Sequence, residues 1–246
     1  MNDFAIWAAA HPYYWLCGLP VLSAVLGGLF WHAFRDARPG RRGLLYGAFA
    51  VLMAALFLWL ALAVRQGGSL VAFDTALARA LGRSASPELL GILSWFTYLG
   101  DRRVLGALAL VMVLLLLLRR QWVLAVAAVA ATAGSGGLNW VLKHLIQRDR
   151  PDFSHGFAHA SGFSFPSGHA SASMAVYGFA CYLLLRLLPE RLRPVCVALT
   201  AALVTAIGVS RVLLQVHYFS DVVAGFAVSA LWLLLCITGA ERGLRR

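Results

Sequence analysis

Long apolar runs separated by short polar or basic segments dominate this chain. A helix needs roughly 20 apolar residues to cross the hydrocarbon core of a bilayer, and a helix satisfies its own backbone hydrogen bonds there. We therefore predict an all-α integral membrane protein. Its seven expected spans cover residues 13–34, 44–64, 104–118, 122–142, 168–185, 195–209 and 219–237.

The segment between the second and third spans has a different pattern. Apolar residues recur there at near-helical spacing with charged residues between them: Leu70, Phe73, Leu77 and Leu81, interleaved with Asp74, Arg79 and Arg83. This pattern predicts an amphipathic helix lying in the membrane interface. Ser86, Pro87 and Glu88 then have the order of an N-cap, a first-turn proline and a first-turn acid. We expect a second short helix from there to about Gly100.

Composition agrees with a membrane protein. Of the 246 residues, 61% are hydrophobic and 13% are charged, against about a quarter charged in soluble domains. The net charge is +11, but the arginines cluster in gaps between apolar runs, a distribution typical of membrane topology signals. We therefore expect membrane lipids, and no nucleic acid, as partners. The four cysteines lie inside apolar runs without a CxxC pair, which indicates neither disulfides nor metal ligands.

The arginines divide unevenly between the two faces of the predicted bundle. Residues 35–43, 119–120, 186–194 and the C-terminal tail share one face and hold twelve arginines, whereas the other face holds eight arginines and the single lysine. By the positive-inside rule the first face is cytoplasmic. We therefore expect the polar segments on the second face to open to the periplasm or exterior.

The most polar stretch, residues 143–169, begins with two cations. Lys143 is followed seven residues later by Arg150, which precedes Pro151. A lysine at a helix end and an arginine in the next turn can converge on one anion, because arginine offers a bidentate fork and lysine a point charge. Snorkelling to the interface is the alternative interpretation of Lys143.

The same stretch ends at the start of the fifth span, with Pro166, Ser167, Gly168 and His169. Free N–H groups and the helix dipole make a helix N-terminus a site for anions. Gly168 permits close approach of the backbone, and His169 falls in the first helical turn. We expect this histidine to lie beside the bound anion.

A second polar segment, residues 210–221, adds a histidine and a carboxylate four residues apart. If the segment is helical, His217 and Asp221 share a face. A carboxylate that holds one imidazole nitrogen leaves the other free to attack. Arg211 adds a third cation, although an Arg211–Asp221 ion pair with a purely structural role is also possible. Three cations can neutralise phosphoryl oxygens without a metal, so we expect neither metal nor cofactor.

These motifs resemble the three-part signature of the type 2 phosphatidic acid phosphatase family, whose superfamily includes bacterial acid phosphatases and vanadium haloperoxidases. The three parts are K-x6-R-P, P-S-G-H and S-R-x5-H-x3-D, and here they occur complete and in order. The resemblance covers roughly residues 44–246 and implies a six-helix lipid phosphatase core. Residues 1–43 would add an extra transmembrane helix and a basic cytoplasmic turn.

The resemblance also implies a role for each motif residue. His217 would be the nucleophile and form a phosphohistidine, and Asp221 would orient it. His169 would protonate the leaving oxygen and then activate water. The phosphoryl oxygens would be held by Lys143, Arg150, Arg211 and the backbone of Ser167 and Gly168.

We therefore expect a lipid phosphatase of a bacterial inner membrane. It would hydrolyse a phosphate monoester or pyrophosphate of a lipid: undecaprenyl pyrophosphate, phosphatidylglycerophosphate, phosphatidic acid or lipid A. A lipid phosphotransferase that uses the same histidine is one alternative, and a membrane transporter with an anion site is another. Five neighbouring polar residues are interpreted as head-group contacts or solvated side chains: Arg148, Asp149, Asp152, His155 and His159.

Overall fold

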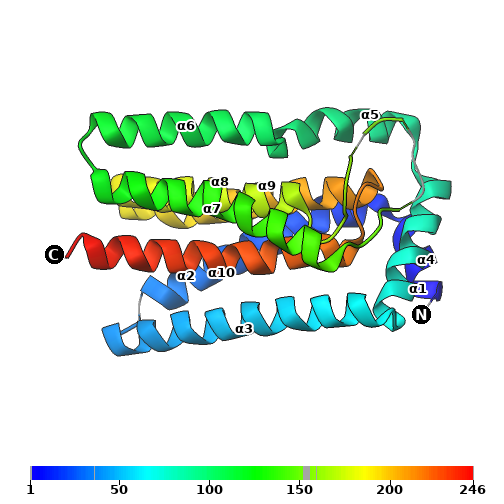
Figure 1. Cartoon of the computed structure of the whole chain (residues 1–246), viewed down its shortest axis with the longest axis horizontal. Helices are drawn as coiled ribbons and strands as arrows, with labels where there is room; N and C mark the ends of the chain where they lie inside the picture. The colour runs from blue at the N-terminus through cyan, green and yellow to red at the C-terminus, as the bar shows by residue number, and fades with distance from the viewer. Residues whose placement is uncertain (1, 36, 152–155, 159, 246) are drawn as a thin grey trace.

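The computed structural model describes residues 2–35, 37–151, 156–158 and 160–245, and over these residues the secondary structure is helical. Long helices run side by side along the molecule (Figure 1). They are α2 (Leu19–Arg35), α3 (Pro39–Gln66), α6 (Arg102–Leu118), α7 (Trp122–Ile146), α8 (Gly168–Leu187), α9 (Arg193–Leu213) and α10 (Phe219–Gly243).

Six described segments are long and apolar enough to cross a membrane, corresponding to α2, α3, α7, α8, α9 and α10. At 17 residues, α6 lies at the lower limit of about 17 for a span. The predicted all-α membrane fold is confirmed. Most span boundaries differ from the prediction by a few residues: α3 begins at Pro39, inside the predicted basic turn, α9 continues to Leu213 and α10 continues to Gly243. The difference that affects the polar segments is in α7, which continues to Ile146 and places Lys143 in its last turn instead of at its end.

Two helices lie across one end of the bundle, α1 (Asn2–Ala10) and α4 (Ser69–Ser84) (Figure 1). The sequence did not indicate α1, because its apolar stretch is too short to stand out from the span that follows. A short π-helical turn, Tyr14–Gly18, joins α1 to α2. The predicted second short helix is α5 (Pro87–Phe96), which a 3-10 turn, Thr97–Gly100, continues towards α6.

The amphipathic pattern of α4 is present, but one of its charges is on the unexpected side. Asp74 is buried on the same face as Leu77 and Leu81. Leu77 and Leu81 lie three and seven residues after Asp74. Residues at these spacings share a helix face, so Asp74 lies on the face of α4 that packs against the core. The N-cap of α5 is as predicted, with Ser86 Oγ accepting a hydrogen bond from Leu89 N at 3.3 Å.

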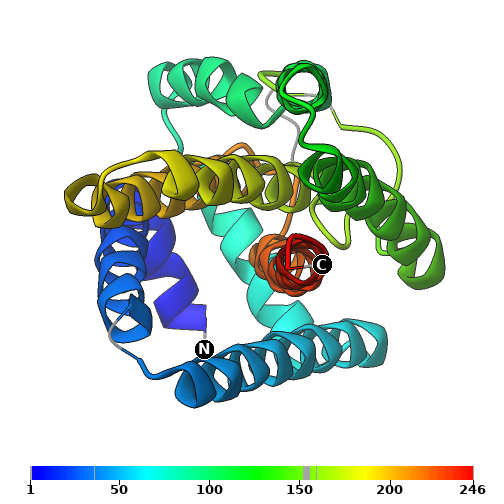
Figure 2. The same ribbon diagram turned by 90° about the vertical axis from the view of Figure 1, so that its left-hand side faces the viewer.

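Helix α10 lies in the middle of the bundle, between α3, α7 and α8 (Figure 2). Glycines allow this close packing: a Cβ atom on Gly134 of α7 would lie 2.8 Å from the ring of Trp232, and one on Gly208 would lie 2.4 Å from Phe226. Gly134 is therefore a point of close approach between α7 and α10. The neighbouring Gly136 and Gly137 face open space.

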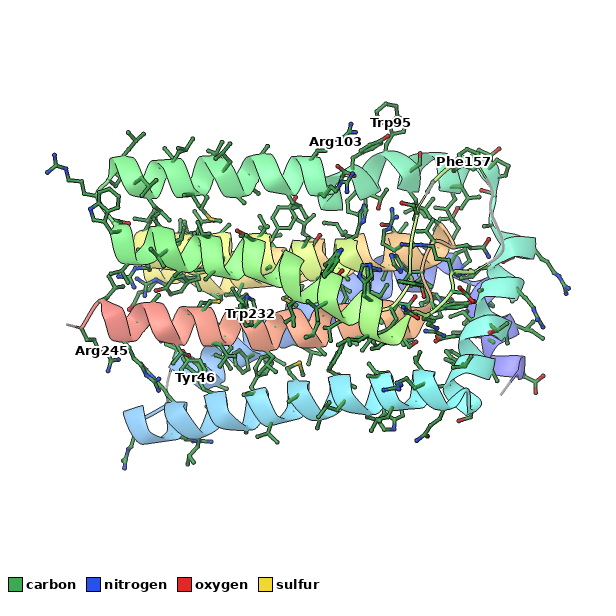
Figure 3. The ribbon with its side chains drawn as sticks, in the orientation of Figure 1. Tyr46, Trp95, Arg103, Phe157, Trp232 and Arg245 are labelled. Carbon is green, nitrogen blue, oxygen red and sulfur yellow. The ribbon has the colours of Figure 1, made fainter. Side chains whose placement is uncertain are left out.

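The two ends of the bundle carry different chemistry. The turns between α2 and α3, α6 and α7, and α8 and α9 lie at the same end as the C-terminus (Figure 1). In Figure 3, Arg245 is at this end and Phe157 is at the other. The arginine-rich turns therefore gather at one end, opposite the polar segments, as the division of arginines between two faces of the bundle predicted. The assignment of the first end to the cytoplasm stays a prediction.

Candidate active site

The polar segments meet where α7 ends and where α8 and α10 begin. Ser167 N donates to the backbone oxygen of Asp221 at 2.9 Å, which ties the starts of α8 and α10 together. Asn139 on α7 braces the same point, donating to Pro166 O at 3.4 Å and to Ser171 Oγ at 3.0 Å. This end of the bundle holds all eight predicted site residues: Lys143, Arg150, Ser167, Gly168, His169, Arg211, His217 and Asp221.

His217 lies in the turn between α9 and α10, not on a helix as the spacing suggested. Because α10 begins at Phe219, the turn itself must bring the ring to Asp221. His217 Nδ1 lies 3.4 Å from Asp221 Oδ2, at the outer limit of a hydrogen bond. The turn is anchored to α4 by Gln215, which adopts a left-handed φ of 55° and donates its side-chain N–H to Ala78 O.

Arg150 and Lys143 converge as predicted. Arg150 Nη1 lies 3.3 Å from His217 Nε2, on the opposite side of the ring from Asp221, and donates to Val216 O at 2.7 Å. Arg150 Nη2 donates to Phe163 O at 3.2 Å, and Lys143 Nζ donates to the same carbonyl. Two cations therefore meet at one carbonyl oxygen, and one of them, Arg150, also reaches His217 Nε2.

Arg211 is the third cation and is 3% exposed. Its Nη1 donates to Thr97 Oγ1 at 2.9 Å, but its Nε is buried and has no hydrogen-bond partner among the described residues. An unsatisfied buried donor costs about 1–3 kcal/mol, so this N–H is suited to an incoming anion. Among the described residues no ion pair joins Arg211 to Asp221. Asp221 Oδ1 binds Arg148 instead.

The surroundings of His217 favour a neutral ring. Burial lowers the pKa of His217 well below its usual value, and Arg150, Arg211 and Lys143 lower it further because they repel an imidazolium. Burial also lowers the pKa of Arg150, an effect that the carboxylate of Asp221 opposes. A neutral imidazole has the free lone pair that nucleophilic attack requires.

The start of α8 supplies the second histidine. Ser167 is the N-cap, and its Oγ accepts from Ala170 N at 3.5 Å. Its backbone N–H is bonded to Asp221 O, so within the predicted pair the backbone donor for an anion would have to come from Gly168. His169 is half-buried against the 3-10 turn before α6, where a Cβ on Gly100 would lie 3.2 Å from its ring.

Sequence reasoning missed the role of Arg148. Its Nη1 lies 2.7 Å from Asp221 Oδ1, and its Nη2 lies 2.9 Å from Asp74 Oδ2. The register of Asp74 with Leu77 and Leu81 was the available signal that a buried charge in α4 needs a partner. The side chain of Asp149 is exposed, in agreement with the solvated interpretation. The other three neighbours lie outside the described residues: Asp152, His155 and His159.

An apolar cavity of about 490 Å³ lies among α2, α3, α8, α9 and α10. Residues such as Phe30, Phe49 and Leu233 line it, and none of the eight predicted site residues does. The polar cluster at the end of the bundle therefore locates the chemistry, and the cavity does not.

Comparison with known proteins identifies the same family. The sequence model of the PAP2 superfamily matches residues 124–243. Phosphatidylglycerophosphatase B of Bacillus subtilis is 37% identical over 111 residues, which are 44% of this chain and 54% of that protein. Lipid A 1-phosphatases of Rhizobium johnstonii and Rhizobium etli are each 38% identical over 120 residues, 45% of this chain and 46% and 48% of their own lengths. The chain thus spans about half the length of the curated relatives it matches.

A solved structure is similar over much more of its length. It is the crystal structure of a transmembrane PAP2-type phosphatidylglycerolphosphate phosphatase from Bacillus subtilis, with 30% identity and a TM-score of 0.72. The match covers 78% of this chain and 96% of that one. This chain belongs to the PAP2 superfamily and has the fold of its transmembrane phosphatases.

Proposed function

We propose that this protein hydrolyses a phosphate monoester or pyrophosphate of a membrane lipid through a phosphohistidine at His217. The observation that carries the proposal is the environment of that ring, with Asp221 at Nδ1 and Arg150 at Nε2. A carboxylate on one nitrogen fixes the tautomer and leaves the other nitrogen as nucleophile. Arginine beside that nitrogen is suited to a phosphoryl oxygen.

In the first step, the Nε2 lone pair of His217 attacks phosphorus and the phosphorus–oxygen bond to the lipid breaks. His169 gives its proton to the leaving oxygen, so the lipid leaves as a neutral alcohol or as the shorter phosphate. Asp221 accepts the Nδ1–H hydrogen bond and stabilises the positive charge that develops on the ring. Lys143, Arg150 and Arg211 neutralise the phosphoryl oxygens, which is the largest expected contribution to the rate.

In the second step, water attacks the phosphohistidine. The now neutral His169 takes a proton from that water, the phosphorus–nitrogen bond breaks, and inorganic phosphate leaves. His217 regains its lone pair, and His169 is again protonated for the next turnover. One histidine therefore acts as acid and then as base.

We propose that this reaction is independent of metal. Three cations surround the nucleophile, and the described residues include no group of three His, Cys, Asp or Glu side chains arranged to hold an ion. These observations support the proposal, and activity in the presence of a chelator tests it.

The candidate substrates are undecaprenyl pyrophosphate, phosphatidylglycerophosphate, phosphatidic acid and lipid A. The names of the curated relatives favour the second and the fourth. We place the protein in a bacterial inner membrane with its active site at the periplasmic face. The gathering of the arginine-bearing turns at the opposite end of the bundle supports this orientation (Figure 1).

We also propose that residues 1–43 are an addition to a lipid phosphatase core formed by residues 44–246. The solved phosphatase is matched over 96% of its length but matches 78% of this chain. About a fifth of the chain therefore has no counterpart there, which supports an added segment.

Phosphate release from the four lipids by detergent-purified protein tests the proposal, with and without EDTA. We expect release that survives EDTA and that disappears in His217→Ala, and the preferred lipid would identify the substrate. A phosphorylated acceptor without free phosphate would indicate the phosphotransferase instead. Well-folded protein that releases phosphate from none of the lipids would contradict the proposal.

A further inference from the structure

Two buried carboxylates share one arginine behind the catalytic histidine. The side chains of Asp74 and Asp221 are both fully buried, and that of Arg148 is 8% exposed. Arg148 reaches Asp221 with one terminal nitrogen and Asp74 with the other. Its guanidinium also lies over the Tyr218 ring, 4.1 Å from the centroid. These contacts leave the guanidinium little freedom to move.

The arrangement holds each oxygen of Asp221 separately. Oδ1 accepts from Arg148 Nη1 at 2.7 Å, while Oδ2 accepts from Tyr218 N at 2.9 Å and faces His217 Nδ1. The carboxylate plane is therefore set by two donors other than the histidine. Oδ2 is presented to the imidazole whether or not the ring is in place.

Asp74 extends this support to α4. Ser220 donates both its hydroxyl and its backbone N–H to Asp74, and Arg148 Nη1 donates to Ser220 Oγ at 2.8 Å. On the other side of His217, Gln215 donates to Ala78 O of the same helix. Helix α4 thus fixes the catalytic turn at residues on both sides of the nucleophile.

The charges of this cluster are strongly coupled. Burial raises the pKa of Asp74, an effect that Arg148 and Ser220 oppose. Burial alone would lower the pKa of Arg148, but Asp221 and Asp74 outweigh it and raise that pKa. Arg148 therefore stays charged and compensates the carboxylate that faces His217.

We infer that Asp74 and Arg148 are positioning residues, which act through Asp221 to set the orientation and charge of His217 without touching the substrate. This inference rests on the proposed function, because it assigns their effect to the nucleophile. It extends the three signature motifs, since Asp74 comes from α4 and Arg148 occupies a variable position of K-x6-R-P.

The pH dependence of catalysis gives this role a signature. The acid limb of kcat/KM reports protonation of the free nucleophile. Loss of the Arg148 charge leaves Asp221 uncompensated, favours the imidazolium and moves that limb to higher pH. Without the Asp74 charge, Arg148 compensates Asp221 alone. The surroundings of His217 then become more positive, which disfavours the imidazolium and moves the acid limb to lower pH. The other titratable or charged groups facing His217 stay unchanged in both variants: Lys143 from α7, Arg150 from the loop, His169 from α8 and Arg211 from α9.

The test compares Arg148→Gln, Arg148→Lys and Asp74→Asn with two matched controls. Asp149→Asn changes an exposed carboxylate beside Arg148, and Arg79→Gln changes an exposed cation of α4. We expect kcat to fall by about 10- to 100-fold in Arg148→Gln and Asp74→Asn, as for a misplaced catalytic group. KM should stay within about twofold, because no substrate contact is lost. The two acid limbs should move in opposite directions, Arg148→Lys should recover part of kcat, and the controls should match the wild type.

Thermal melting and gel filtration establish that each variant is folded. If Arg148→Gln is not recovered in folded form, two other measurements test whether Asp74 and Arg148 are positioning residues: the kcat of Arg148→Lys and the acid limb of Asp74→Asn. Folded variants with wild-type kcat and an unmoved acid limb, alongside an inactive His217→Ala, would overturn this inference and leave the proposed function intact. Activity that persists in His217→Ala would instead overturn the proposed function.

Discussion

Ion pairs at the two ends of the bundle have the same length but different surroundings. Arg148 and Asp221 lie 2.7 Å apart at the catalytic end, with side chains 8% and 0% exposed. Arg186 and Glu241 lie 2.7 Å apart at the opposite end, with side chains 39% and 41% exposed. The first pair belongs to a network that reaches Asp74 and His217, whereas the second adds the hydroxyl of Tyr182.

Because the two distances are equal, we expect burial to decide what each ion pair contributes. Removing one partner of a buried pair costs about 3–5 kcal/mol, because the other charge is left without compensation. An exposed pair contributes about 0–1 kcal/mol, since water replaces the lost partner. The same carboxylate-to-amide change at the two ends should therefore have very different consequences.

Asp221→Asn should have the largest effect. The amide can present its N–H to Nδ1 and so favour the wrong tautomer, and it no longer stabilises the charge that forms on the ring. A change of this kind at an orienting carboxylate lowers kcat by about 10⁴. Turnover of the preferred lipid, measured with folded protein, checks this value. A loss of less than tenfold would contradict the role assigned to Asp221.

Arg150→Gln should have the next largest effect. In the proposed mechanism its guanidinium holds a phosphoryl oxygen, so kcat/KM should fall by about 10²–10³. Arg150 also lowers the pKa of His217, so the residual activity should have its acid limb at higher pH. A pH profile of kcat/KM measures both effects. An acid limb that stays at the wild-type pH would show that Arg150 does not influence the nucleophile.

Gly225→Ala should destabilise the catalytic end. A Cβ atom at this position of α10 would lie 2.8 Å from the backbone oxygen of Ser167, which cannot move without disturbing the start of α8. Overpacking of this kind costs about 1–3 kcal/mol. Gly239→Ala is the matched control, because a Cβ there meets open space in the same helix. Thermal melting should separate the two variants, and equal stability would contradict the close contact.

Glu241→Gln should have the smallest effect. The pair with Arg186 is exposed, so stability should change by no more than about 1 kcal/mol, and lipid turnover should match the wild type. The variant serves as the control for Asp221→Asn. A loss of turnover here would mean that the two ends are coupled through α10.

The sequence predicted the helical spans and the eight motif residues because these depend on local pattern. The length of an apolar run indicates a membrane span, and a motif such as K-x6-R-P can be recognised directly in the sequence. The conformation around His217 could not be obtained in this way, since α10 begins at Phe219 and the histidine lies in the preceding turn. Helix periodicity placed Asp221 near it for the wrong reason.

The partner of Asp74 could not be predicted because it depends on tertiary structure. Residues 74, 148 and 220 lie on three separate elements, and their meeting depends on how α4 crosses the end of the bundle. The amphipathic pattern predicted helix α4 correctly, but it grouped Asp74 with the exposed charges of that helix. Only its register with Leu77 and Leu81 indicated a buried position.

Trapping the covalent intermediate would identify the nucleophile. Protein mixed with lipid labelled in its terminal phosphate would be quenched in alkali within the first turnover, and the labelled peptide would be identified. We expect an acid-labile, alkali-stable phosphate on the peptide that contains His217, and no label in His217→Ala. Label on another residue, or rapid turnover by His217→Ala, would show that His217 is not the nucleophile.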